Sequence, residues 1–343
     1  MKRRSFVSKL LVGVSTTYIG LDKTLPSLGT YCSIQKELEL GIIGLSPHSA
    51  AFSTILNDKN KGSDLNGCRI KVLYHPKGNP DVEFTNEQLE SYKSDVLSAG
   101  VEIVNDMDTL LSRVDGVLIE TNDGRPHMEQ VMPVLEAGKP VFVDKPVAEN
   151  LASVIEIYET AEKYGVPIFS SSSLRYGSKV QIINQNEKEK VLGASTFSPA
   201  PLEPSHTDLF WYGIHGVEML YSVMGTGCQW VQQLNEDEGE DVVVGYWNGG
   251  RIGTFRGIRS GKRGYGGRVF AVDSIEALGT FEGYRPLVVS IVDFFNTNTA
   301  PVAKEETLEI YAFMEAAHRS KRLNGERVSL SLVMKDIREN TSK

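Results

Sequence analysis

Cysteine, clustered positive charge and long apolar runs are all scarce in this sequence. Its 36 lysine and arginine residues are outnumbered by 44 aspartate and glutamate residues, which gives 343 residues a net charge of −8. Because phosphate contacts need clustered positive charge and no basic stripe is present, we expect no nucleic-acid partner. The three cysteines match neither a metal motif nor an evident disulfide framework. We expect Cys68 and Cys228 to be small buried hydrophobes, although one pair could still oxidise in an exported protein.

The apolar run nearest the N-terminus, 10–19, is too short and too rich in hydroxyl residues to span a bilayer. A lysine and two arginines precede it at positions 2–4, and Phe6 and Lys9 follow them, a pattern that resembles a twin-arginine export signal. We therefore predict that residues 1–33 are an export signal and that the mature protein is periplasmic, without a stable membrane span. A cytosolic protein with a chance basic start and an uncleaved anchor are the alternatives.

Strand-like and helix-like segments alternate strictly in the first half of the chain. Short apolar runs predict strands at 38–45, 69–74, 101–104, 117–121, 140–143 and 166–170. Between them, helical periodicity predicts helices at 49–57, 86–99, 108–113, 128–137 and 151–164. This alternation predicts an α/β fold with an N-terminal Rossmann domain, a doubly wound parallel sheet. We place the dinucleotide-binding domain at residues 36–150.

After about residue 175 the pattern changes. Strand-like runs follow one another closely at 192–198, 230–234, 241–247, 251–257 and 268–273, with helices at 211–224, 287–295 and 305–322. They predict a C-terminal α+β domain with an open, largely antiparallel sheet. We place this substrate and oligomerisation domain at 151–330, where its first helix and strand complete the Rossmann sheet. Because an open sheet can pair with another subunit, we expect a homo-oligomer, either a dimer or a tetramer.

The turn after the first predicted strand lacks two glycines of the dinucleotide-binding motif Gly-x-Gly-x-x-Gly. Gly44, Ser46 and Ser49 occupy the three positions, so only the first glycine is present. The N-terminus of the following helix can still bind an anion, and the Ser46 hydroxyl could bond to a phosphate. His48 could contact phosphate or substrate, or it could be a solvent-facing loop residue.

The second predicted strand lacks an acid at its end, where an NAD-binding sheet normally has one for the adenosine ribose. It ends instead in Tyr-His-Pro-Lys at 74–77. His75 and Lys77 could receive the 2′-phosphate of NADP, or they could form a polar loop. We expect NAD as the cofactor, with NADP or the absence of a firmly bound cofactor as alternatives.

The most informative segment is 115–150. It contains Thr121-Asn122, His127, Gly138-Lys139 and Asp144-Lys145-Pro146. In this it resembles the glucose–fructose oxidoreductase / inositol dehydrogenase / rhizopine-catabolism (Gfo/Idh/MocA) family, whose members show Thr-x-Asn, a following histidine and a Gly-Lys-x-Val strand ending in Glu-Lys-Pro. Aspartate here replaces the usual glutamate. The resemblance covers about residues 38–325 and implies an NAD(P)-dependent oxidoreductase. It assigns cofactor contacts to Thr121, Asn122, His127, Asp144 and Lys145.

Lys145 is the main catalytic candidate. It follows the fifth predicted strand, and parallel sheets bind their ligands beyond the carboxyl ends of the strands. An ammonium there can assist removal of a hydroxyl proton as hydride leaves; a surface lysine before a proline turn is the alternative. The resemblance also implies a catalytic histidine, matched by His215, with an acid four residues earlier. Trp211 stands in place of that acid, so Asp208 could substitute for it, and His215 could otherwise be a core histidine.

Several further polar residues would face the same cleft. Arg175 and Tyr176 end the sixth predicted strand, and Tyr284 and Arg285 precede a predicted helix. Such side chains suit a polyhydroxylated ligand, and we also assign substrate contacts to Asp208 and Trp211. His206, Asp208 and His215 are metal ligands by residue type, but the resemblance implies no metal.

These observations predict an exported NAD(P)-dependent dehydrogenase that acts on a secondary alcohol of a small-molecule sugar or glycoside. C3 of a glucoside is the preferred position, because exported relatives often act on glycosides. One alternative is a glycosidase that oxidises, eliminates, adds water and re-reduces with tightly held NAD. The other is a non-catalytic carbohydrate-binding partner subunit on the same scaffold.

Overall fold

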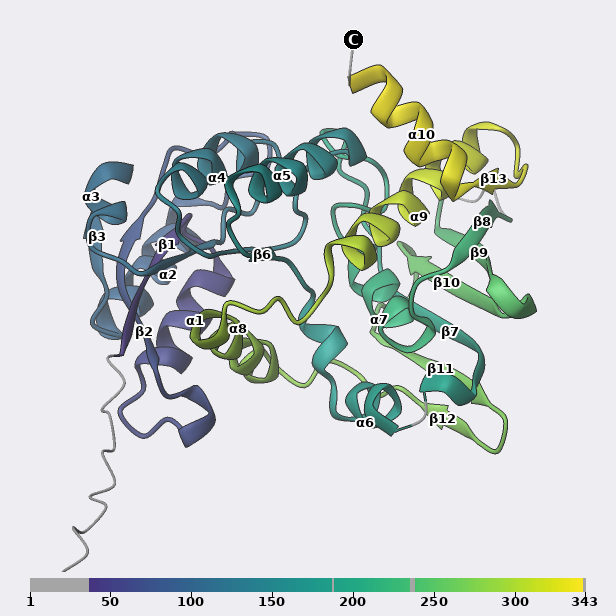
Figure 1. Cartoon of the computed structure of the whole chain (residues 1–343), viewed down its shortest axis with the longest axis horizontal. Coiled ribbons are helices and arrows are strands. Elements are labelled where there is room, and N and C mark those ends of the chain that lie inside the picture. Colours follow the sequence, from purple (N-terminus) through teal and green to yellow (C-terminus); the bar gives the residue numbers. More distant parts are fainter. Residues whose placement is uncertain (1–36, 187, 235–237, 342–343) are drawn as a thin grey trace, which may run out of the picture. The chain divides into compact units, whose positions relative to one another are not determined.

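Six short apolar strands form the first sheet of the computed structural model (Figure 1). Their order is β3-β2-β1-β4-β5-β6, and every pairing is parallel. They are β1 (Leu38–Ile43), β2 (Cys68–Tyr74), β3 (Glu102–Val104), β4 (Gly116–Ile119), β5 (Val141–Val143) and β6 (Ile168–Phe169). The strand order reverses between β1 and β4, which creates a ligand crevice at the carboxyl ends of these strands. The predicted Rossmann sheet is thus confirmed. The structure describes residues 37–186, 188–234 and 238–341, so the predicted export signal lies outside the described residues.

Helices cover both faces of this sheet, which explains why its central strands are apolar throughout. They are α1 (Pro47–Asn57), α2 (Asn86–Ser98), α3 (Met107–Leu111), α4 (His127–Glu136) and α5 (Leu151–Tyr164), close to their predicted bounds. A later helix, α8 (Arg285–Thr297), joins α1 and α2 in one hydrophobic cluster, whereas α3, α4 and α5 contribute to the other. In that first cluster Phe294 of α8 packs edge-on against Phe169 of β6, with ring centroids 4.8 Å apart.

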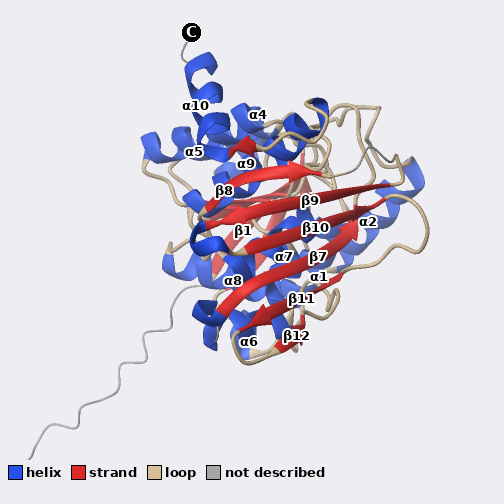
Figure 2. Cartoon of the chain, turned by 90° about the vertical axis from the view of Figure 1, so that its right-hand side faces the viewer, coloured by secondary structure: helices blue, strands red, loops and turns tan. Residues whose placement is uncertain are grey.

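The second sheet has the order β12-β11-β7-β10-β9-β8-β13 (Figure 2). Its strands are β7 (Val191–Pro199), β8 (Cys228–Gln233), β9 (Glu240–Trp247), β10 (Ile252–Ile258), β11 (Gly266–Ala271), β12 (Ile275–Ala277) and β13 (Val328–Ser329). All pairings are antiparallel except β7 with β10, so the predicted sheet is confirmed with one parallel pair. Helices α7 (Ile214–Met224) and α9 (Lys304–Arg322) pack on one face. Four elements were not predicted from the sequence: β12, β13, α6 (Ser178–Asn186) and α10 (Leu330–Thr341).

Exposed apolar side chains lie on the second sheet, among them Leu192, Phe197, Ile252 and Phe270. Pairing of this sheet with a second subunit, and the domain boundary at residue 150, stay predictions. Within the described part of the chain, no helix has the length and apolar character needed to cross a membrane. Cys68 and Cys228 are buried free thiols, as predicted.

Candidate active site

The turn after β1 depends on Gly44, which has a φ of +98° in the left-handed region that suits glycine. A Cβ atom added at Gly44 would lie 2.5 Å from the backbone nitrogen of Thr121. The turn therefore lies so close to the residue after β4 that no side chain fits at this position. The Gly44 amide donates a hydrogen bond to the carbonyl oxygen of Tyr74 at 2.8 Å, which holds the ends of β1 and β2 together.

The two serines that replace glycines cap α1. Ser46 Oγ accepts a hydrogen bond from the Ser49 amide at 3.2 Å, and Ser49 Oγ accepts one from the Ser46 amide at 2.8 Å, which forms a capping box. Pro47, at the first helical position, has no N–H group. Most amide groups that a bare helix end would offer to a phosphate are therefore already used. The His48 amide has no partner among the described residues and stays available.

Two cavities flank this turn along the carboxyl edge of the first sheet. One of about 360 Å³ lies at the ends of β2 and β3 and includes Leu45, Leu73, His75 and Asn105 in its lining. Burial lowers the pKa of His75 there. The other cavity, of about 270 Å³, is lined by Ser46, Pro47 and His48 on the α1 side. Hollows on both sides of a glycine turn fit the two ends of a dinucleotide that crosses the sheet edge.

The cavity of about 270 Å³ brings together most of the predicted site. Its lining includes residues that the sequence analysis named, which are Ser46, His48, Asn122, Asp144, Lys145, His215 and Tyr284. It also includes residues that were not predicted, among them Phe84, Ser173, Tyr212, Tyr265 and Phe281. The first sheet supplies Asp144 and Lys145 after β5, and the second part of the chain supplies His215 at the start of α7. We call this cavity the central cavity.

Lys145 faces an aromatic wall in the central cavity. Its Nζ lies 5.7 Å from the centroid of the Tyr212 ring, within the range of a cation–π contact. Tyr265 donates a hydrogen bond from its hydroxyl to the Tyr212 hydroxyl at 3.0 Å. The hydrogen bond fixes the Tyr212 ring, and the cation–π contact with that ring holds the Lys145 ammonium at the cavity wall. Tyr212 stands three residues before His215, in the turn that leads into α7, and this proximity to His215 is the signal that could have identified it.

His215 is buried, and its Nδ1 lies 2.7 Å from Ser172 Oγ. Burial lowers its pKa well below 6.5, and the nearby charges of Lys145 and His48 lower it further, so the ring is neutral at pH 7. Its Nε2 has no hydrogen-bond partner among the described residues. When Nδ1 donates to Ser172, the lone pair of Nε2 is free to accept a proton; the other tautomer presents an N–H donor.

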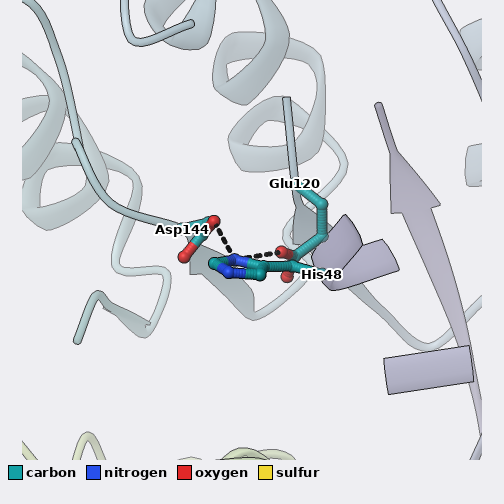
Figure 3. A group of neighbouring side chains, drawn as sticks. All are labelled: His48, Glu120 and Asp144. Carbon is teal, nitrogen blue, oxygen red and sulfur yellow. Dashed lines mark hydrogen bonds and ion pairs between the residues drawn. The ribbon is translucent and has the colours of Figure 1, made fainter. Parts of the chain in front are cut away.

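Beside Lys145, three titratable side chains meet at the carboxyl ends of the strands (Figure 3). His48 Nδ1 donates to Asp144 Oδ2 at 2.6 Å and lies 4.0 Å from Glu120 Oε2. Burial opposes ionisation of Asp144, but the charge and hydrogen bond of His48 lower its pKa below the usual range. Burial, and then the charge of Asp144, raise the pKa of Glu120. Glu120 was missed, although a lone acid directly after the apolar run of β4 is a visible signal.

Two predicted cofactor contacts are instead structural. His127 is fully buried, and its two ring nitrogens lie 3.0 Å from the carbonyl oxygens of Thr121 and Val147. Thr121 Oγ1 donates to Gln130 Oε1 at 2.9 Å and lies behind the Gly44 turn. Neither residue is part of the central cavity lining. Their hydrogen bonds instead hold the segment that follows β4 in place. Asn122, which does line it, donates to the carbonyl oxygen of Val82 at 3.2 Å.

Three predicted substrate contacts also need correction. Arg175 is buried in ion pairs with Glu218, at 3.2 Å, and Glu306, at 2.6 Å. Tyr176 belongs to the hydrophobic cluster around α8. Arg285 pairs with Asp64 at the surface, 2.7 Å away. Arg175 and Tyr176 lie in a 3-10 turn after β6 rather than on the strand, and the buried carboxylates attract the arginine away from the cavity.

Asp208 does not support His215. Its carboxylate accepts a hydrogen bond from Lys321 at 2.9 Å, and it lies 3.5 Å from His318. Hydrogen bonds with His318 and Lys321 lower the pKa of Asp208. The acid predicted to replace the one missing at Trp211 is therefore used elsewhere.

The Trp211 ring packs against that of His206, with centroids 4.9 Å apart, and is not part of the central cavity lining. His206 Nε2 accepts a hydrogen bond from the Gly124 amide at 3.2 Å. Over the described ranges, His206, Asp208 and His215 do not form a metal-binding group.

A six-stranded Rossmann sheet, a second open sheet, and a lysine and a histidine in one cavity define a two-sheet oxidoreductase scaffold. Residues 39–172 match the model of the GFO_IDH_MocA family, described as the oxidoreductase family with an NAD-binding Rossmann fold. Over this segment the predicted resemblance to that family is confirmed, as is the predicted NAD cofactor. Among curated proteins, none matches the chain significantly.

Solved structures share the fold over nearly their whole length. Myo-inositol 2-dehydrogenase from Lactobacillus plantarum is 15% identical with a TM-score of 0.69, covering 86% of this chain and 99% of that one. Scyllo-inositol dehydrogenase from Lactobacillus casei is 14% identical with a TM-score of 0.67, covering 87% and 99%. GenD2 from gentamicin A biosynthesis, solved in complex with NAD, is 14% identical with a TM-score of 0.68, covering 86% and 96%. At these identities the likeness shows a shared fold.

Proposed function

We propose that this protein is an NAD-dependent dehydrogenase that oxidises a secondary alcohol of a sugar or glycoside, or reduces the corresponding ketone. The observation that carries the proposal is the meeting of Lys145 and His215 in the central cavity. The Gly44 turn, the α1 N-terminus and the cavity beside His75 would hold NAD, which accepts or supplies the hydride when bound.

The two proton-handling groups have different roles. The Lys145 ammonium hydrogen-bonds the oxygen of the reacting hydroxyl and favours its deprotonation. His215 is neutral, so its Nε2 accepts the hydroxyl proton during oxidation and returns it during reduction. Ser172 fixes the ring through Nδ1, 2.7 Å away. The Tyr212 ring beside Lys145 keeps the ammonium oriented.

The lining of the central cavity supports a sugar-like substrate. Polar groups of Asn122, Ser173 and Tyr284 can hydrogen-bond hydroxyls, while the rings of Tyr265 and Phe281 offer surfaces for the C–H face of a sugar. Two of the compared structures are inositol dehydrogenases, whose substrates are ring polyols. We propose C3 of a glucoside as the reacting position, in keeping with the export that positions 2–9 of the sequence indicate.

The test is turnover by the purified protein with NAD⁺ and a panel of glucosides, free sugars and inositols, followed by NADH absorbance and by product analysis. Ketone formation with stoichiometric NADH supports the proposal. Cleavage of a glycosidic bond without net NADH would indicate a redox-elimination glycosidase instead. Failure of NAD to bind, measured by native mass spectrometry, would contradict both enzymes and indicate a carbohydrate-binding subunit.

The proposed export is tested separately. A double substitution of Arg3 and Arg4 by lysine in the full chain should retain the protein in the cytoplasm, as judged by cell fractionation. An unchanged distribution would contradict a twin-arginine route. The same fractions, cross-linked in dilute solution, report whether the protein is the expected dimer or tetramer.

A further inference from the structure

We propose that His48, Glu120 and Asp144 bind a divalent metal ion at the carboxyl edge of the first sheet. The three residues come from different elements, the first turn of α1, the end of β4 and the end of β5. One ligand atom from each, His48 Nδ1 and a carboxylate oxygen of each acid, lies within 4.8 Å of the others. Across the described ranges 37–186, 188–234 and 238–341, no other group of such residues is this close.

Glu120 provides independent support. Its side chain is fully buried, and neither carboxylate oxygen has a hydrogen-bond partner. Buried carboxyl oxygens are normally paired, because an unpaired one forfeits its hydration without replacement. The Glu120 side chain is directed toward His48 and Asp144 (Figure 3). A cation between the three residues would supply the missing partner.

The spacing of the ligand atoms fits an ion of this kind. Bonds of roughly 2.1 Å to nitrogen and oxygen place the ligand atoms of a tetrahedral ion about 3.4 Å apart. The distance from His48 Nδ1 to Asp144 is 2.6 Å and that to Glu120 is 4.0 Å, so the two values bracket this spacing. Insertion of an ion needs the His48 ring to move away from Asp144 by under roughly 1 Å, which a small side-chain rotation achieves.

The donor set and charge define the class of ion. One imidazole and two carboxylates are borderline to hard ligands, which favour Zn²⁺, Mn²⁺ or Fe²⁺ over soft ions. The two carboxylates also balance the double positive charge of the ion, so the occupied site has no net positive charge that would repel the ammonium of Lys145. His48 and Asp144 line the central cavity, whereas Glu120 is not part of its lining. The open coordination position therefore faces the space proposed for substrate, a feature that hydride transfer to NAD does not require.

The test uses Mn²⁺ and the full-length protein without any substrate, so it is independent of dehydrogenase activity. Titration followed by electron paramagnetic resonance should show one bound ion per chain, with coupling to one imidazole nitrogen by electron spin-echo spectroscopy. Glu120→Gln, of equal size, and His48→Asn, at a partly exposed position, should each weaken binding at least about 100-fold. His48→Asn should also abolish the nitrogen coupling.

His318→Asn is the matched control, because His318 lies 3.5 Å from the single carboxylate of Asp208 with Lys321 beside it. It should leave Mn²⁺ affinity unchanged. Absence of stoichiometric binding, or equal affinity in the wild type and both cavity variants, would overturn the site. Should Glu120→Gln fail to fold by circular dichroism, His48→Asn decides the question alone.

Discussion

Replacement of Arg175 by methionine should destabilise the protein strongly, since it removes a buried cation that pairs with the buried Glu218 and the partly buried Glu306. The guanidinium contacts Glu218 at 3.2 Å and Glu306 at 2.6 Å, and it is the principal positive partner that the described structure gives Glu218. Breaking one side of a buried ion pair typically costs about 3–5 kcal/mol because the remaining charge stays desolvated. Such a loss lowers the folded-to-unfolded ratio by roughly two to three and a half orders of magnitude at 25 °C.

Arg285→Met is the matched control, because Arg285 makes a 2.7 Å ion pair with Asp64 that is about half exposed on both sides. An exposed pair contributes about 0–1 kcal/mol. Urea unfolding, followed by tryptophan fluorescence, measures both variants. If Arg175→Met shifted the transition no more than Arg285→Met, the reasoning from burial would be refuted. The double variant with Glu218→Gln should recover part of the loss.

The same buried pair also reaches the active site. Glu218 Oε1 accepts hydrogen bonds from Ser171 Oγ at 2.9 Å and from the Ser172 amide at 3.3 Å, and Ser172 holds His215. Arg175 is thus a positioning residue for the proposed base. Arg175→Met should lower kcat more than it changes the KM for NAD, measured at a temperature where the variant is folded.

Further predictions concern the proposed machinery. Lys145→Met should lower kcat about 10²–10⁴-fold while NAD still binds, as turnover and fluorescence titration will show; full turnover would exclude Lys145 as a proton-handling residue. The folded-state pKa of His215 lies below the ordinary value of 6.5. The stability that the neutral ring contributes is therefore complete above pH 6.5 and is lost as the pH falls toward the folded-state pKa. Urea unfolding at several pH values measures this loss. His215→Asn should remove that component. Gly44→Ala combines a φ of +98° with a Cβ 2.5 Å from Thr121, so it should destabilise more than Gly138→Ala, which has open space around its Cβ; equal melting temperatures would contradict the crowding.

Regular periodicity made the first sheet predictable. The apolar runs of β1, β4 and β5 are buried on both faces, and the helices between them begin at capping residues such as Thr85 and Asn150, whose side chains accept from the N3 amides. Three residues of the site could be identified from their positions along the sequence. Lys145 follows the end of a strand, whereas His215 and Tyr284 lie at the starts of helices, and such positions often face the ligand-binding edge of a sheet. The parallel register of β7 and β10 carries no local signal, since parallel and antiparallel strands share the same alternation of side chains.

The sequence failed where a distant partner determines the direction of a side chain. Arg175 was expected in the cavity, but Glu218, 43 residues later, holds it in the interior. Asp208 was expected beside His215, but Lys321, 113 residues later, binds it. Such partners are chosen by burial and charge in the folded chain, and spacing along the sequence does not encode them.

Helix α8 sets the order in which this chain can finish folding. Phe294 and its neighbours close the face of the first sheet that contains Phe142 and Phe169, yet the ribosome makes α8 more than a hundred residues after β6. During synthesis the nascent Rossmann sheet therefore waits with an open apolar face, exposed to chaperones and to aggregation. The dinucleotide-binding half of the protein reaches its native packing only after strands β7 to β12 of the second sheet have been made.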